Sequence, residues 1–103
     1  MDAIMYLEFM TPFEVAKLIA EAAKEKRLSL NMSQQTLSER SGVSLSVLKK
    51  FERTGRISLE SLLKLAHILG SLKEFSQTFA KSAYQDETLD SILKQKKRKR
   101  GRK

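Results

Sequence analysis

Two helix start signals and a glycine stop stand close together in MSQQTLSERSGVSLSVLKKFERTG, residues 32–55. Ser33 and Ser44 each occupy the position of a helix N-cap, and Gly42 is the residue type that ends a helix in the left-handed conformation. A single residue separates Gly42 from Ser44, so the connection is tight. We expect the second helix to end near Arg53. The stretch predicts two short helices joined by a glycine turn, which is a helix-turn-helix arrangement.

The second of these helices is predicted to expose a face without acids. Its inward side is expected to carry three apolar residues that recur at helical spacing, Val47, Leu48 and Phe51. The outward side then carries short or cationic side chains, Leu45, Ser46, Lys49 and Lys50. Such a face at the start of a helix suits the major groove of DNA, and a solvated helix face is the alternative.

Three more helices are predicted around this pair. Thr11, Pro12 and Glu14 form a capping-box pattern, so a helix should run from residue 12 to about Arg27. Its inward stripe is expected to be Ala16, Ile19, Ala22, Ala23 and Lys26. A further helix should begin after Ser58 and stop at Gly70, with an apolar stripe of Leu59, Leu62, Leu63, Ala66 and Leu69. A fifth helix is expected over residues 72–81.

Composition restricts the classes of function. The chain has 103 residues, of which 41% are apolar, with one histidine and no cysteine. One small domain is expected, without a disulfide, metal site or cofactor. Without a cysteine nucleophile or a glycine-rich phosphate loop, we expect no enzyme. The lack of cysteine fits a cytoplasmic protein. No run approaches the roughly 20 apolar residues of a membrane helix, so we expect no membrane partner.

The last ten residues, 94–103, carry eight of the 20 basic side chains. The other 12 basic residues equal the 12 acids, so the first 93 residues are net neutral. We expect this tail to be disordered when free and to add nonspecific affinity for nucleic acid. A nuclear-import signal and a solubilising end are the alternatives. The predicted tail contacts are Lys96, Lys97, Arg98, Lys99, Arg100 and Arg102.

Residues 32–70 resemble the Xre/Cro-type helix-turn-helix family of transcriptional regulators. The matching features are Gln34, Leu37, Gly42-Val43-Ser44, Phe51-Glu52-Arg53 and Ser58-Leu59-Glu60. Ser38 and Ser41 depart from the family pattern, which more often has small apolar residues there. The resemblance implies an all-α, five-helix, lambda-repressor-like domain. The expected organisation is an arm (1–11), this domain (12–81), a linker or short helix (82–93) and the disordered basic tail (94–103).

The resemblance also implies roles for individual residues. The implied phosphate contacts are Gln34, Ser44 and Lys49. The implied base contacts are Leu45, Ser46 and Lys50, and the predicted DNA-binding set is completed by Arg53 and Arg56. Leu45 either contacts a thymine methyl group or is an ordinary surface residue.

Two further sets of residues are expected to hold the structure together. The family often pairs an arginine near the end of the first helix with the glutamate that closes the third, here Arg27 and Glu52. Regulators of this kind usually bind as dimers to two half-sites about 34 Å apart. We therefore expect a homodimer interface on the fifth helix, formed by Leu72, Phe75 and Phe79. The arm residues Ile4, Met5, Tyr6, Leu7 and Phe9 either join it or cover their own core.

A narrower resemblance covers nearly the whole chain. The run FERTGRISLESLLKLAHILG, a later Leu-Asp-Ser-Ile-Leu stretch and the basic end are similar to small HipB-type antitoxins encoded beside HipA-like kinase toxins. This implies a repressor that binds a double-stranded operator on the nucleoid, autoregulates its toxin-antitoxin operon and binds the kinase toxin. The alternative is a stand-alone Xre-type repressor without a toxin partner. A DNA-coating protein would instead bind without sequence preference.

Overall fold

The computed structural model describes residues 10–80, and all of the regular structure in this range is helical. The helices are α2 (Pro12–Ser29), α3 (Gln34–Ser41), α4 (Leu45–Thr54), α5 (Leu59–Leu69) and α6 (Leu72–Ser76). The predicted all-α class is confirmed. The arm up to Phe9, the stretch 82–93 and the basic tail lie outside the described residues. Within residues 10–80, no helix is long and apolar enough to cross a membrane.

Hydroxyl caps start four of the helices. The side chains of Thr11, Ser33, Ser44 and Ser58 each accept a hydrogen bond from the backbone N–H three residues later. At α2 the box is reciprocal, because the Thr11 N–H donates to Glu14 Oε1 over 2.9 Å. That hydrogen bond is the main reason why the pKa of Glu14 lies below its usual range. The predicted starts of these four helices are therefore confirmed.

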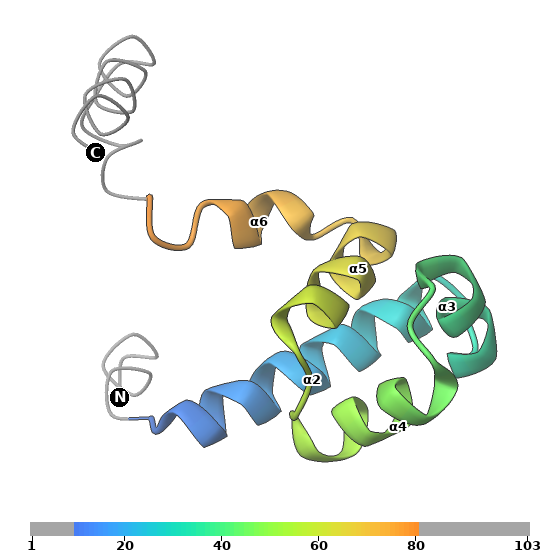
Figure 1. Ribbon diagram of the computed structural model, residues 1–103, viewed down its shortest axis with the longest axis horizontal. Helices are drawn as coiled ribbons and strands as arrows, with labels where there is room; N and C mark the ends of the chain where they lie inside the picture. The colour runs from blue at the N-terminus through green and yellow to red at the C-terminus, as the bar shows by residue number, and fades with distance from the viewer. Residues whose placement is uncertain (1–9, 81–103) are drawn as a thin grey trace, which may run out of the picture. The chain divides into compact units, whose positions relative to one another are not determined.

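The chain forms two compact units, and the boundary between them lies after Leu72. The buried core lies in the first unit. In this part α2 and α3 each pack against both α4 and α5 (Figure 1). Phe51, Leu37, Leu48 and Leu65 have the largest fully buried side chains. The remaining members of the buried cluster are Ala20, Met32, Val43 and Leu69. Burial of one large apolar side chain typically contributes about 1.5 to 3 kcal/mol, so this cluster is the main source of stability.

The predicted inward stripe of α2 was correct in part: Ile19 and Ala23 pack against the buried cluster, but other positions of the stripe do not. Ala22 and Lys26 are exposed, whereas Ala20 and Arg27 are buried. Ala16, Ile19 and Ala23 are half-buried. The charge of Arg27 argues against burial, but a charged group can be buried when a partner accepts its hydrogen bonds.

Two other helices also differ from the predicted faces. In α4, Leu48 and Phe51 are buried as predicted, but Val47, which was also expected inward, is 37% exposed, and Leu45, which was expected outward, is half-buried. In α5, Ala66 and Leu69 are buried as predicted, but Leu59 is 68% exposed and Leu65, which the predicted stripe left out, is 1% exposed. Leu59 is the first residue of α5, whereas Leu65 lies in its second half and belongs to the buried cluster.

The helix α6 is shorter than the predicted span of 72–81. It ends at Ser76, whose Oγ donates to the Lys73 carbonyl over 2.7 Å. The next residues continue with hydrogen bonds between positions three apart, from Gln77 N–H to Glu74 and from Thr78 N–H to Phe75. Serine favours helix ends because its side chain competes for backbone groups.

Candidate nucleic-acid interface

The turn between α3 and α4 is held by glycine geometry and by two serines. Gly42 has φ 79°, a left-handed conformation that suits glycine. The Ser38 Oγ donates to the Val43 carbonyl over 2.6 Å, and the Ser41 Oγ accepts from the Val43 N–H over 3.1 Å. The two serines that depart from the family pattern thus satisfy both backbone groups of the turn residue. This fixes where α4 begins relative to α3.

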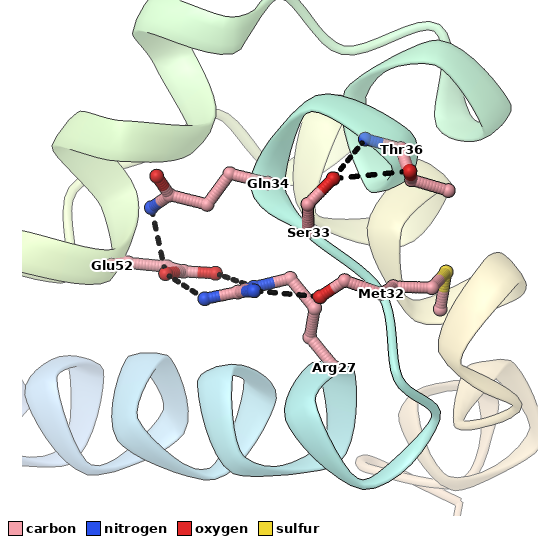
Figure 2. Close-up of polar contacts among 6 residues, drawn as sticks. All are labelled: Arg27, Met32, Ser33, Gln34, Thr36 and Glu52. Carbon is pink, nitrogen blue, oxygen red and sulfur yellow. Dashed lines mark hydrogen bonds and ion pairs between the residues drawn. The ribbon is translucent and has the colours of Figure 1, made fainter.

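A buried ion pair ties α2 to α4 (Figure 2). Arg27 Nε lies 2.8 Å from Glu52 Oε2, and Arg27 Nη2 donates to Glu52 Oε1 over 3.1 Å. Arg27 Nη1 donates to the Met32 carbonyl over 2.8 Å. Two parallel bonds to one carboxylate form the geometry that a guanidinium holds best. The structure therefore brings together the two residues that the family resemblance pairs.

Gln34 joins the same network from the first turn of α3. Its Nε2 donates to Glu52 Oε1 over 2.9 Å, so this carboxylate receives hydrogen bonds from both α2 and α3 (Figure 2). The family resemblance implies a phosphate contact for Gln34 and does not predict this bond. Local sequence around Gln34 gives no signal for it, because Glu52 follows 18 residues later.

The network also changes the charge of the exposed surface. Glu52 is the one acid in α4, and its side chain is 5% exposed. With Glu52 turned inward and paired, the exposed charges that α4 contributes are all positive. Lys49, Lys50 and Arg53 are exposed, and Arg56 is exposed in the turn after the helix. Such a surface attracts a polyanion.

The remaining predicted DNA contacts lie at the start of α4. Ser44 is exposed, and its Oγ accepts from the Val47 N–H over 3.3 Å. Ser46 is nearby, with 3.4 Å between the two hydroxyl oxygens. Leu45 is half-buried, and Val47, which the sequence pattern placed inward, is exposed instead. Leu45, Leu48 and Phe51 recur every three residues, so the sequence pattern also permits the observed face.

A helix-turn-helix family model (HTH_3) matches residues 24–75, which are 52 of the 103 residues of the chain. The chain belongs to the helix-turn-helix family. Its model is the Xre and lambda-repressor-like class, so the broader of the two resemblances is confirmed. No curated protein and no solved structure matches the chain.

This helix-turn-helix protein is a sequence-specific DNA-binding transcriptional regulator. The matched residues begin at Lys24 and include the end of α2, both helices of the motif and α5. They therefore contain the ion pair, the glycine turn and the exposed face of α4.

Proposed function

We propose that this protein is a homodimeric repressor that reads its operator with the first turns of α4. The observation that carries the proposal is the exposed, acid-free face of that helix, which the turn at Gly42 and the Arg27–Glu52 pair hold in place. A rigid helix with exposed polar and cationic residues near its N-terminus can enter the major groove. Repression follows when a dimer so bound occupies the promoter.

Roles within the site follow from side-chain chemistry. Ser46 and Lys50 face base edges in this proposal, and Lys50 donates to guanine O6 and N7. The positions of the other contacts suit phosphates, which fix the register of the protein on the duplex. These proposed phosphate contacts are Gln34, Ser44, Lys49, Arg53 and Arg56. Gln34 keeps one amide hydrogen and its carbonyl oxygen available besides the bond to Glu52.

Lys50→Ala tests the base contact. We expect discrimination between the operator and a scrambled duplex to fall by about 1 to 3 kcal/mol, because a guanine loses its donor. The measurement is fluorescence anisotropy on both duplexes at one salt concentration, with an operator selected from a random pool. Lys49→Ala is the matched control, since removing a phosphate contact weakens binding to both duplexes equally. An equal loss of affinity for both duplexes with Lys50→Ala would assign Lys50 to a phosphate.

The proposed dimer uses Leu72, Phe75 and Phe79. Leu72 is 40% exposed and Phe79 fully exposed, so apolar surface is available for a second copy. We expect sedimentation equilibrium to give twice the 11.8 kDa mass of one chain. Phe79→Ser should weaken the dimer, whereas Phe13→Ser, at an exposed position on α2, should not. A monomer at all concentrations, or equal effects of the two substitutions, would contradict this interface.

We further propose that the regulator belongs to a toxin-antitoxin operon, autoregulates it and binds its kinase toxin. The support is the similarity of the sequence to HipB-type antitoxins over the run that begins at Phe51 and over the basic end. In this proposal the chain acts in the cytoplasm, on the nucleoid.

A pull-down with the tagged chain expressed from its own locus tests the partner. After nuclease treatment, mass spectrometry should identify a kinase-like protein in near-stoichiometric amount. Recovery of the bait alone would contradict the toxin proposal and favour a stand-alone repressor. DNA recovered before nuclease treatment, sequenced from the same sample, should contain the promoter of the chain's own operon.

A further inference from the structure

The first turn of α4 exposes an aliphatic side chain that the proposed DNA contacts do not use. Val47 is the third residue of α4 and is 37% exposed, although the next residue, Leu48, is 1% exposed. Its backbone N–H is bound to the Ser44 Oγ, so its position in the first turn is fixed. Leu45, the residue that the sequence pattern offered for an apolar base contact, is half-buried.

We infer that Val47 recognises the C5 methyl group of a thymine in the major groove of the operator. This inference rests on the proposed use of α4 as the reading helix. Thymine alone among the four DNA bases presents a methyl group in that groove, and it is read by apolar contact. Valine has no polar side-chain atom to contribute, and its branched Cβ restricts χ1, so it presents its methyl groups in a fixed direction.

Stability does not explain an exposed valine at this position. Valine has a lower helix propensity than alanine or lysine, and Val47 is absent from the buried cluster formed by Leu48, Phe51 and their neighbours. An isolated exposed apolar residue is common on protein surfaces. Here, however, it lies between Ser46 and Lys50, both exposed, in the part of α4 where the proposed base contacts lie.

The spacing along α4 places the thymine near the guanine of Lys50. Residues three apart on a helix have Cβ atoms about 5 to 6 Å apart. Successive base pairs are separated by about 3.4 Å along one strand. Val47 and Lys50 therefore reach base pairs that are one or two steps apart. The operator half-site is expected to contain a guanine and a thymine at this separation.

Deoxyuridine substitution tests the contact, because it removes the methyl group and leaves every hydrogen-bonding group of thymine in place. The full chain first selects an operator from a random duplex pool, and each thymine is then replaced singly. Affinity for wild type should fall about threefold to tenfold at one thymine in each half-site, the range expected for one buried methyl group. Val47→Ala should bind the unmodified operator as weakly as wild type binds the operator with deoxyuridine at that thymine. Its affinity should not fall further when this thymine is replaced by deoxyuridine.

Two further variants make the result specific. Lys50→Ala should keep the deoxyuridine effect while losing guanine discrimination. Val47→Thr, nearly equal in volume to valine, should lose part of the effect, and thermal melting should show that both Val47 variants remain folded. Wild type indifferent to every deoxyuridine, or Val47→Ala with full sensitivity, would overturn the thymine contact. If the thymine contact is overturned but Lys50→Ala still loses discrimination between operator and scrambled DNA, the proposed function stands. If the random pool yields no enriched sequence, both the proposed function and the thymine contact are overturned.

Discussion

Glu52 receives hydrogen bonds from two side chains that reach it from different helices, Arg27 from α2 and Gln34 from α3 (Figure 2). The side chains of Arg27 and Glu52 are 7% and 5% exposed. Taking either charge out of water alone would be expensive, and the pairing offsets this only while both partners remain. The position of α4, the proposed reading helix, therefore depends on a few polar atoms as well as on its apolar core.

Arg27→Met is expected to lower the free energy of unfolding by about 3 kcal/mol, because it leaves the Glu52 carboxylate buried with only Gln34 as a side-chain donor. Urea denaturation measures the change. Lys64→Met is the matched control, since Lys64 pairs with Glu60 over 3.4 Å and both side chains are exposed. Exposed pairs contribute about 0 to 1 kcal/mol.

The double substitution Arg27→Met with Glu52→Met separates two causes of destabilisation. One is the cost of leaving a buried charge unpaired, and the other is the loss of the ion pair itself. Two apolar side chains in place of a buried ion pair are often neutral or stabilising, so much of the stability should be recovered. Equal small effects of Arg27→Met and Lys64→Met would show that the buried pair is not important for stability. The preference of the double variant for the operator over scrambled DNA would show how well α4 is positioned without the ion pair.

The connection from α4 to α5 depends on a close approach to α2. Gly55 has φ 82°, and a Cβ placed on it would lie 2.8 Å from the Ala16 carbonyl carbon and 2.9 Å from the Lys17 nitrogen. These are backbone atoms, which cannot rotate away. A side chain at Gly55 would therefore push the C-terminal end of α4 away from α2. The turn at Gly42 has a similar φ but open space around it.

A comparison of Gly55→Ala with Gly42→Ala separates the cost of a strained backbone conformation from the cost of a steric clash with α2. Both substitutions force a non-glycine residue into the left-handed region, at about 1 to 2 kcal/mol. Only Gly55→Ala adds the collision with α2, and overpacking of this kind costs about 2 kcal/mol more. Thermal denaturation of the two variants should show the larger destabilisation for Gly55→Ala. Equal destabilisation would mean that the turn relaxes away from α2 without penalty.

Charge is distributed unevenly over the whole molecule. The first 93 residues are net neutral, and the formal charge of +8 equals the number of basic residues between 94 and 103. A polyanion attracts such an end whatever its sequence, whereas base contacts from α4 would discriminate among sequences. Affinity and specificity are thus expected to depend on different parts of the chain.

Deletion of residues 94–103 is expected to flatten the dependence of log affinity on log salt. Each tail cation that neutralises a phosphate contributes about 0.9 to the slope, so the truncated chain loses that amount per contact. Preference for the operator over scrambled DNA should remain. The control is a tail with the same ten residues in shuffled order, which should behave as wild type. A slope unchanged by the deletion would show that the tail does not contact DNA.

Local chemistry along the chain was sufficient to predict where the helices begin, although not where α6 ends. Thr11, Ser33, Ser44 and Ser58 each accept a hydrogen bond from an N–H three residues away, so a cap is visible wherever the right residue stands before a periodic run. The glycines that end the helices act through their own φ angles. The resemblance to Xre-type regulators, which the family match confirms, rests on the same short-range features.

Periodicity correctly placed Leu37, Leu48 and Leu69 in the core, but the full set of inward residues in α2 and α4 was beyond such reasoning. Ala20 and Arg27 face inward, and Val47 faces outward, because of what α2 and α4 meet across the core. When apolar residues recur at spacings of three and four, either of two adjacent helix faces can be the buried one. Which face is buried depends on contacts with residues distant in the chain. Glu52 lies 25 residues from Arg27 and 18 from Gln34, so no local pattern could place these three side chains together. Helix ends follow from hydrogen bonds between near neighbours, whereas burial and the composition of the exposed face of α4 follow from packing between segments far apart in sequence.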